Sequence, residues 1–257
     1  MPAPTPPSLY LQITRAIKGG DLFTLRGLLR NQSDWARLLG VDQVVDLPYD
    51  AACDAKWEIF QLLLANGFGR QNRRLAGKLI AGVCRADISE PEMLSRVDEL
   101  LLQGADAGPP NPFLNIAAKR GYVSVVARLL DAGADVEDTS HDGVPVLHEL
   151  AWMFRGDPTI TQRGRYAVAE LLLNHGADVN GGKTQKRMPI RQAVASGDLR
   201  MVRLLLQHGA TANIANSWGD TPLHEAVIRH SDDSSGLIQS EESEVVETVR
   251  LLLAAGA

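Results

Sequence analysis

Six segments of this 257-residue chain end in the same way, with a run of leucines, one or two spacer residues and then a glycine. The glycines are Gly67, Gly104, Gly133, Gly176, Gly209 and Gly256, and only the copy at Gly104 has a single spacer residue. Self-similarity every few tens of residues is typical of a stacked array in which each unit packs on its neighbours. We therefore expect a repeat structure that presents a long surface to another molecule rather than one deep cleft.

The segment 217–256 is the clearest unit. Thr221 is placed to cap a helix N-terminus, and Pro222 follows at the first helical position, where its missing N–H costs nothing. A second helix is predicted from about Val245 to Ala254, and Gly256 then takes a left-handed C-cap. A helix pair this short cannot bury its apolar face alone, so the units must stack and the fold is predicted to be all-α.

Two motifs in these units resemble the signatures of the ankyrin-repeat family. Residues 221–224 read Thr-Pro-Leu-His, and residues 176–180 read Gly-Ala-Asp-Val-Asn. Gly176 and Gly209 lie 33 residues apart, which is the period of that family. The resemblance implies an ankyrin-repeat solenoid of about seven stacked helix-turn-helix repeats, connected by short β-hairpin fingers.

The likeness is uneven along the chain. We predict a disordered segment at 1–7, degenerate ankyrin-like repeats at 8–110 and repeats closer to consensus at 111–257. Stretched loops are expected near 85–91, 156–164 and 231–244, and the last of these is predicted to be mobile because it is polar and acidic. Insertions of this kind arise by drift or serve as docking loops. We call the Gly-Ala-Asp-Val-Asn motif and its looser copies the tag. Because the chain stops at Gly256-Ala257, within a copy of the tag, we expect it to be truncated at its C-terminus.

Composition and charge exclude several classes of function. The net charge of −5 argues against nonspecific binding of nucleic acid, which needs a basic surface. No apolar run approaches the length that crosses a bilayer, and the proline-rich start is not a secretory signal. Cys53 and Cys84 are too few for a disulfide framework and are predicted to be small buried thiols in a reducing compartment. We expect a cytoplasmic protein, with the nucleus as the alternative.

No arrangement of residues predicts an enzyme, a metal site or a cofactor. Residues 181–184 end like a phosphate-binding loop, but the first glycine and the preceding buried strand are missing. The Thr-Pro-Leu-His motif at 221–224, with a degraded copy at 145–148, is the tetrapeptide that opens a first helix. His148 and His224 occupy its fourth position, where the resemblance implies a local hydrogen bond that holds the turn. His175 and His208 precede tag glycines at helix ends and are expected to face solvent.

The resemblance implies that a partner protein binds at the fingertips and along the exposed side of the first helix of each repeat. The fingertip residues are Ser140, His141, Asp142, Thr184, Gln185, Lys186, Ser217 and Trp218, and those on first helices are Glu149, Trp152, Met153, Gln192, Ser196, Glu225 and Arg229. Trp218 is either an exposed anchor for a partner or folds back on the neighbouring finger. Trp152 either fills the core or lies on the binding face.

We therefore predict a monomeric interaction scaffold or adaptor that binds another protein, but not nucleic acid or membrane. The alternative is a targeting or regulatory segment of a larger multidomain protein, an enzyme or effector, whose catalytic part lies outside this chain.

Two asparagines carry a separate hypothesis. Asn180 and Asn213 each follow a leucine by eight residues, a pattern that resembles ankyrin asparagines hydroxylated at the β-carbon by a 2-oxoglutarate oxygenase. The alternative is that each asparagine only bonds its own turn.

Overall fold

A computed structural model describes most of the chain. The described residues are 9–30, 39, 41–68, 73–108, 113–139, 143–152, 162–181, 188–216, 218–231 and 238–257, without the side chains of 41–45, 73–76, 162–163, 229–231 and 238–243. They divide into two compact units, Met1–Ile116 with Asp131–Ala134, and Ala117–Leu130 with Asp135–Ala257. The predicted segment at 1–7 lies outside the described residues.

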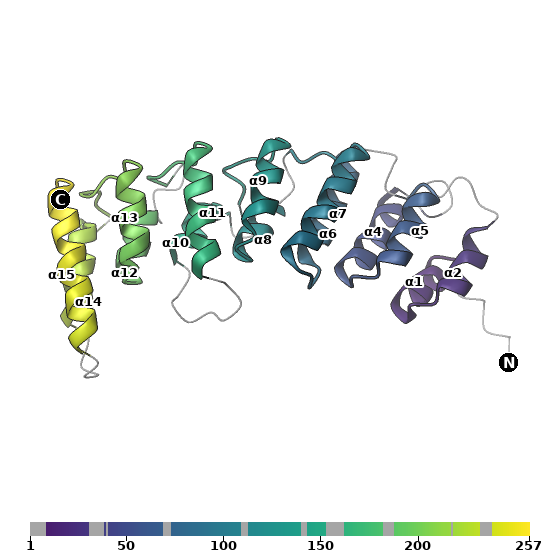
Figure 1. Ribbon diagram of the computed structural model, residues 1–257, viewed down its shortest axis with the longest axis horizontal. Helices are drawn as coiled ribbons and strands as arrows, with labels where there is room; N and C mark the ends of the chain where they lie inside the picture. The colour runs from purple at the N-terminus through teal and green to yellow at the C-terminus, as the bar shows by residue number, and fades with distance from the viewer. Residues whose placement is uncertain are drawn as a thin grey trace. The chain divides into compact units, whose positions relative to one another are not determined.

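Fourteen helices occur in the described residues, and they follow one another as seven helix-turn-helix pairs (Figure 1). The pairs are α1 (Leu9–Gly19) with α2 (Leu22–Leu29), α4 (Val41–Cys53) with α5 (Trp57–Ala65), α6 (Arg73–Arg85) with α7 (Glu90–Leu102), α8 (Phe113–Lys119) with α9 (Val123–Asp131), α10 (Val146–Trp152) with α11 (Gln162–Asn174), α12 (Pro189–Ala195) with α13 (Leu199–Gln207), and α14 (Pro222–Ser231) with α15 (Ile238–Ala254). This confirms the predicted all-α fold of about seven repeats.

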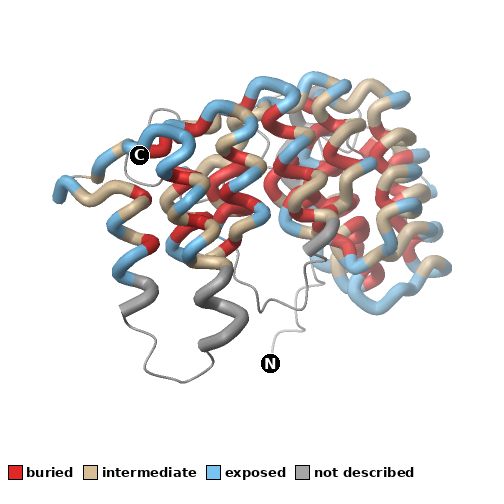
Figure 2. Tube along the Cα trace, turned by 60° about the vertical axis from the view of Figure 1, so that its left-hand side comes forward, coloured by how far each residue is buried: buried red, intermediate tan, exposed pale blue. Residues whose placement is uncertain are grey.

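Within each unit, helices stack on the equivalent helix of the next pair. In the first unit α4 packs on α1, α5 and α6, while α2 packs on α5. In the second unit α12 lies between α10 and α14, and α13 lies between α11 and α15. The buried residues follow the inner sides of these helices, and the exposed ones gather at the turns and outer surfaces (Figure 2). Each helix pair therefore buries its apolar side against its neighbours, as the short units require.

The repeated glycines end the second helices in the predicted way. All six have φ between 86° and 92°, in the left-handed region that favours glycine. At the end of α11 the Gly176 N–H donates to the Leu173 carbonyl (3.0 Å), and the Ala177 N–H donates to the Leu172 carbonyl (3.0 Å). These two bonds satisfy carbonyls that would otherwise have no partner at the helix end.

The leucine four residues before each glycine lies in the core. Leu63, Leu100, Leu129, Leu172, Leu205 and Leu252 are all at most 2% exposed. The repeat that ends at Gly104 keeps the same glycine geometry although it lacks one spacer residue. Its third leucine, Leu102, therefore moves to the position that Ala65 and Gln207 hold in other repeats, and it is 86% exposed.

The helix-opening tetrapeptide behaves as the resemblance implies. Pro222 is the first residue of α14, and the Thr221 N–H donates to Nδ1 of His224 (3.1 Å), with Thr221 Oγ1 2.9 Å from the same nitrogen. His148, the equivalent residue of α10, is buried. Of the two histidines predicted to face solvent, His175 does so, whereas His208 is half-buried.

Two predicted loops are shorter than expected. Near 85–91 the connection comprises only residues 86–89, because the extra length has gone into α6 and α7, each of 13 residues. The second helix of the last pair begins at Ile238 rather than near Val245, so the second part of the predicted 231–244 loop is helical. Of the segment 156–164, residues 162–164 belong to α11 and the remainder lies outside the described residues.

The described parts of the fingers contain one isolated antiparallel bridge, between Thr139 and Pro145. It stands at the base of the predicted finger between α9 and α10.

Candidate functional site

Trp218 stands exposed at a fingertip. Trp218 is 84% exposed, so its ring does not fold back on the neighbouring finger. Asn216 shapes this tip, because its Oδ1 accepts hydrogen bonds from the N–H groups of Trp218 (2.8 Å) and Asp220 (2.8 Å). The Asn216 N–H also donates to the Asp220 carbonyl (2.9 Å). The tight turn therefore presents Trp218 with most of its surface exposed.

The other predicted fingertip residues lie outside the described residues. They are Ser140, His141, Asp142, Thr184, Gln185, Lys186 and Ser217. Their place in a binding surface stays a prediction.

On the first helices of the second unit, the predicted glutamates pair with neighbouring repeats. Glu149 of α10 forms an ion pair with Lys119 at the end of α8, with 2.6 Å between Lys119 Nζ and Glu149 Oε2. Glu225 of α14 forms an ion pair with Arg191 of α12. Both glutamates are largely covered, so their charges are neutralised within the chain. Lys119 and Arg191 were not predicted as site residues, because only the stacking shows which repeats their side chains reach.

Trp152 lies on the surface of α10 and is 55% exposed, so it does not fill the core; its place on a binding face stays a prediction. Gln192 on α12 is half-buried, and Ser196 bonds the Ala193 carbonyl through its hydroxyl (3.1 Å). Met153 and the side chain of Arg229 lie outside the described residues. The second unit thus presents two exposed tryptophans, Trp152 on a first helix and Trp218 on a finger.

At two of the tags, the residue four positions after the glycine bonds the next repeat. Glu137 accepts the Asp178 N–H (2.7 Å), and Asn180 accepts the Thr211 N–H through its Oδ1 (2.8 Å). Asn213 occupies the same tag position and is exposed. Asn180 therefore bridges two repeats rather than only closing its own turn. Hydroxylation of either asparagine stays a prediction.

A buried polar cluster, absent from the sequence predictions, joins α11 to α13. Arg165 and Asp198 form an ion pair with both side chains almost completely buried. The Tyr166 hydroxyl donates to Asp198 Oδ1 (2.8 Å), and the Arg200 guanidinium lies 4.3 Å from the Tyr166 ring centre. Asp198 also caps α13 by accepting the Met201 N–H (3.0 Å). Arg165 and Asp198 are 33 positions apart in the sequence, so no local pattern could have predicted their contact.

In the first unit, Cys53 lies beside Tyr49 on α4. Burial raises the pKa of the Cys53 thiol, and burial likewise raises the pKa of the Tyr49 hydroxyl, which bonds Arg85. Cys84 is fully buried as predicted, whereas Cys53 is only half-buried. A cavity of about 230 Å³ lies next to Cys53, and Thr14, Ile17, Lys18, Leu47, Asp50 and Asp54 complete its lining. A thiol held protonated in this way is a poor nucleophile.

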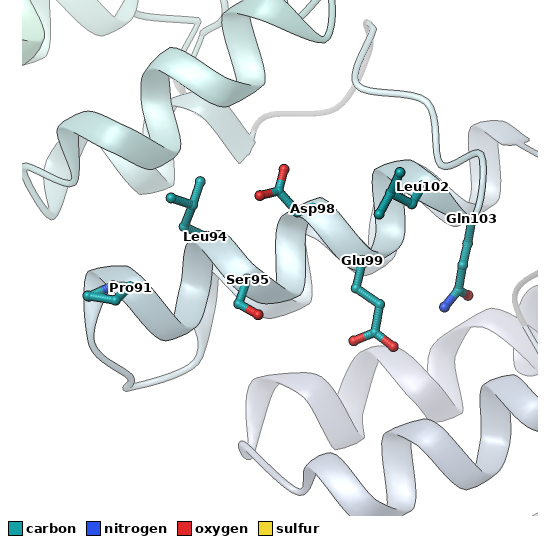
Figure 3. A pocket seen from close by; sticks show the side chains of 7 residues that line it. All are labelled: Pro91, Leu94, Ser95, Asp98, Glu99, Leu102 and Gln103. Carbon is teal, nitrogen blue, oxygen red and sulfur yellow. The ribbon is translucent and has the colours of Figure 1, made fainter.

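A second hollow, of about 640 Å³, runs along α7 (Figure 3). Leu94, Asp98 and Leu102 project from one side of the helix, while Ser95 and Glu99 project from the other. Glu99 accepts a hydrogen bond from Gln61 (2.6 Å). The hollow brings together no set of groups with an evident chemical task.

Within the ranges that the structure describes, no three His, Cys, Asp or Glu side chains are placed to share a metal ion. None of the described helices combines the length and the apolar character that a membrane crossing demands.

Comparison with known proteins matches the repeats directly. The family described as Ankyrin repeats (3 copies) matches residues 159–257. The chain is 33% identical over 121 residues to a cyclin-dependent kinase 4 inhibitor B from Rattus norvegicus, covering 47% of this chain and 81% of that protein. It is 30% identical over 138 residues to a cyclin-dependent kinase 4 inhibitor B from Homo sapiens, covering 53% of this chain and 88% of that protein. With its helix pairs, tag glycines and tetrapeptide turns, this chain belongs to the ankyrin-repeat family, whose members bind other proteins.

Proposed function

We propose that this protein is an interaction scaffold or adaptor that binds a partner protein through its second unit. The exposure of Trp218 and Trp152 carries the proposal. Tryptophan is the residue most enriched among those that dominate binding energy at protein interfaces. A large indole ring held in water gains free energy when a partner covers it. The fingertip and the exposed side of the first helices together form the binding surface.

The charge of the chain supports a protein partner over nucleic acid. The net charge is −5, and Arg191 and Lys119 are paired with glutamates on the proposed surface. Counterion release from a phosphate backbone requires basic side chains that remain available to it. We accordingly propose a monomer that works without a cofactor, does no catalysis of its own, binds neither nucleic acid nor membrane, and resides in the cytoplasm or nucleus.

The two relatives suggest a first partner to test. Their name describes inhibition of a cyclin-dependent kinase. Because the aligned segments span most of each relative, a protein kinase is a reasonable class of partner for this chain. Affinity capture therefore uses a purified cyclin-dependent kinase beside lysate from source cells.

Affinity capture with single variants tests the proposal. We expect Trp218→Ala and Trp152→Ala each to weaken retention of a saturable partner at least tenfold, a typical loss for a central interface anchor. Phe23→Ala is the matched control, because Phe23 is 90% exposed but lies on α2 in the first unit. Circular dichroism confirms that the helices persist in each variant. A partner that both tryptophan variants retain, but the Phe23 variant loses, contradicts the proposed surface.

A further inference from the structure

Two asparagines of this chain are followed directly by glycine, Asn66 and Asn180. In such a pair the backbone nitrogen of the glycine can attack the side-chain amide carbon of the asparagine, because glycine has no Cβ that blocks the approach. The structure holds the two asparagine side chains in opposite ways. The same pair of residues therefore meets two different chemical environments in one chain.

The Asn180 amide is bonded through its oxygen. Its Oδ1 accepts the Thr211 N–H of the next repeat (2.8 Å). Because a backbone N–H only donates, its partner fixes this atom as the amide oxygen. A donor at that position draws electrons away from Cγ. It also stabilises the negative charge that builds on Oδ1 during attack at Cγ, as the donors of an oxyanion hole do.

The Asn66 amide is bonded through its nitrogen instead. Its Nδ2 donates to the Leu62 carbonyl near the end of α5 (2.8 Å), which keeps electron density on the amide and ties down the group that would have to leave. The Gly67 N–H, which would have to supply the attacking nitrogen, donates to the Leu64 carbonyl (3.0 Å). Release of Gly67 therefore opens the end of α5, so we expect Asn66 to be protected.

The backbone at Asn180 is held by bonds within one short turn. The Asn180 N–H donates to Asp178 Oδ1 (2.9 Å), and the Gly181 N–H donates to the Asp178 carbonyl (3.2 Å). Only the second of these bonds involves the attacking nitrogen, and breaking it opens a turn rather than a helix. Rotation about the Asn180 Cα–C bond frees Gly181 while the Asn180 side chain stays on Thr211.

We propose that Asn180 is a site of spontaneous deamidation in the folded protein, with the Thr211 N–H as the oxyanion donor. The Gly181 nitrogen bonds to Asn180 Cγ and loses its proton, the Cγ–Nδ2 bond breaks, and ammonia leaves with a proton that balances the one lost. The result is a five-membered succinimide ring. Water then opens the ring at either carbonyl and leaves aspartate or isoaspartate at position 180.

The two products differ at the bridge to the next repeat. Aspartate presents a carboxylate oxygen in place of Oδ1, so the Thr211 N–H keeps an acceptor. In isoaspartate the main chain runs through Cγ and is one methylene longer, which carries the acceptor away from Thr211. Deamidation is thus an age-dependent change in repeat stacking. The inference is independent of the proposed function, because it concerns contacts within the chain.

Asn213 is the matched control for the tag position. It lies four residues after Gly209, as Asn180 lies four residues after Gly176, but Ile214 follows it instead of glycine. The branched isoleucine side chain hinders attack by its own backbone nitrogen. We therefore expect Asn213 to stay intact while Asn180 is lost.

Peptide mapping by mass spectrometry tests the inference on the full chain after incubation at slightly alkaline pH. Trypsin releases the three asparagines on separate peptides, 57–70, 166–183 and 204–229. Deamidation replaces NH₂ by OH, whereas hydroxylation adds an oxygen, so their masses differ. The same incubation is run on wild type, on wild type unfolded in guanidinium chloride, and on Thr211→Pro, which lacks the donor N–H.

In folded wild type we expect Asn180 to deamidate at least about tenfold faster than Asn66, because one oxyanion donor contributes roughly 10²–10³ to the rate in enzymes. In the unfolded chain the two sites should react at similar rates. Thr211→Pro, once circular dichroism shows that it is folded, should slow Asn180 and leave Asn66 unchanged. If the variant does not fold, the ratio of the two sites in wild type decides.

Three results overturn the inference. They are an intact Asn180 in the folded protein, equal rates at Asn180 and Asn66 in the folded protein, and a folded Thr211→Pro variant that loses Asn180 as fast as wild type does. Hydrogen exchange tests the consequence for stacking. The Thr211 amide should lose protection as isoaspartate accumulates, whereas Asn180→Asp should keep it.

Discussion

Replacement of Asp198 by alanine is expected to destabilise the second unit more than any loss of a surface contact could. Asp198 meets Arg165 in an ion pair whose two side chains are almost completely buried. Its Oδ1 also accepts hydrogen bonds from the Tyr166 hydroxyl (2.8 Å) and from the Met201 N–H at the start of α13 (3.0 Å). The variant removes all three interactions and leaves the arginine charge in the core.

The expected loss follows from these contacts. Removing one partner of a buried ion pair costs about 3–5 kcal/mol, because the remaining charge stays buried without compensation. Losing the helix cap adds about 1 kcal/mol. The sum of about 4–6 kcal/mol is comparable to the whole stability of many domains. We therefore expect α11 and α13 to unfold locally under conditions where wild type is folded.

Asp21→Ala provides a matched control within the same chain. Asp21 follows Gly20 as Asp198 follows Gly197, and it caps α2 by accepting the Thr24 N–H (2.9 Å). Its side chain lies at the surface and accepts hydrogen bonds from the N–H and the hydroxyl of Thr24. The control thus removes a cap of the same geometry without stranding a buried charge, so its effect should be much smaller.

Urea unfolding measures how much the free energy of unfolding decreases, and hydrogen exchange shows which helices lose protection. Because stacked repeats touch only their neighbours, exchange should rise around α11 and α13 rather than along the chain. The double variant Arg165→Met/Asp198→Ala should recover a large part of the stability, since it removes the stranded charge. Equal losses in Asp198→Ala and Asp21→Ala, or no recovery in the double variant, would refute this reasoning.

Four further predictions concern individual packing and backbone positions. Leu205→Ala should cost about 2–5 kcal/mol in urea unfolding because Leu205 is fully buried, whereas Leu102→Ala should be nearly neutral because Leu102 is exposed. Gly164→Ala should destabilise by about 1–3 kcal/mol in the same assay, since the added Cβ would lie 2.4 Å from a backbone oxygen of the preceding repeat, and an unchanged midpoint would contradict that. Ala55→Gly should raise stability by about 1 kcal/mol, because Ala55 has φ of 53° where equivalent turns use glycine. The Cys53 thiol should react with a thiol reagent more slowly than a free cysteine peptide at neutral pH and accelerate only at higher pH, because its raised pKa keeps it protonated; equal rates would exclude that shift.

Much of the fold could be predicted because its signals are local. Each tag glycine is predicted from the local need for a left-handed backbone conformation at the end of a helix, and all six glycines adopt it. The turn at Thr221 and His224 closes over four residues and formed as the tetrapeptide implied. The exposure of Leu102 was also within reach of the sequence, since counting back from Gly104 places this leucine one position out of register. Loop lengths were less certain, because helix propensity allowed α7 and α15 to begin earlier than their apolar patterns suggested.

The candidate site was predictable only in outline. The family resemblance indicated the first helices and fingertips as a binding surface, with Trp152 and Trp218 among its residues. It could not decide whether either ring was buried, because that depends on whether a neighbouring finger or helix covers it; that either ring contacts a partner stays a prediction. The pairing of Glu149 with Lys119, and of Glu225 with Arg191, likewise depends on which side chains of adjacent repeats come within reach.

The sequence by itself determined the repeat, the helix pairs and the residues that end them, because those features depend on contacts between residues a few positions apart. Only the tertiary structure decided that Arg165 meets Asp198 in the core, that Asn180 bridges to Thr211, and that Arg191 pairs with Glu225. Such contacts join residues more than thirty positions apart. They arise from the stacking of one repeat on the next, which no local pattern encodes.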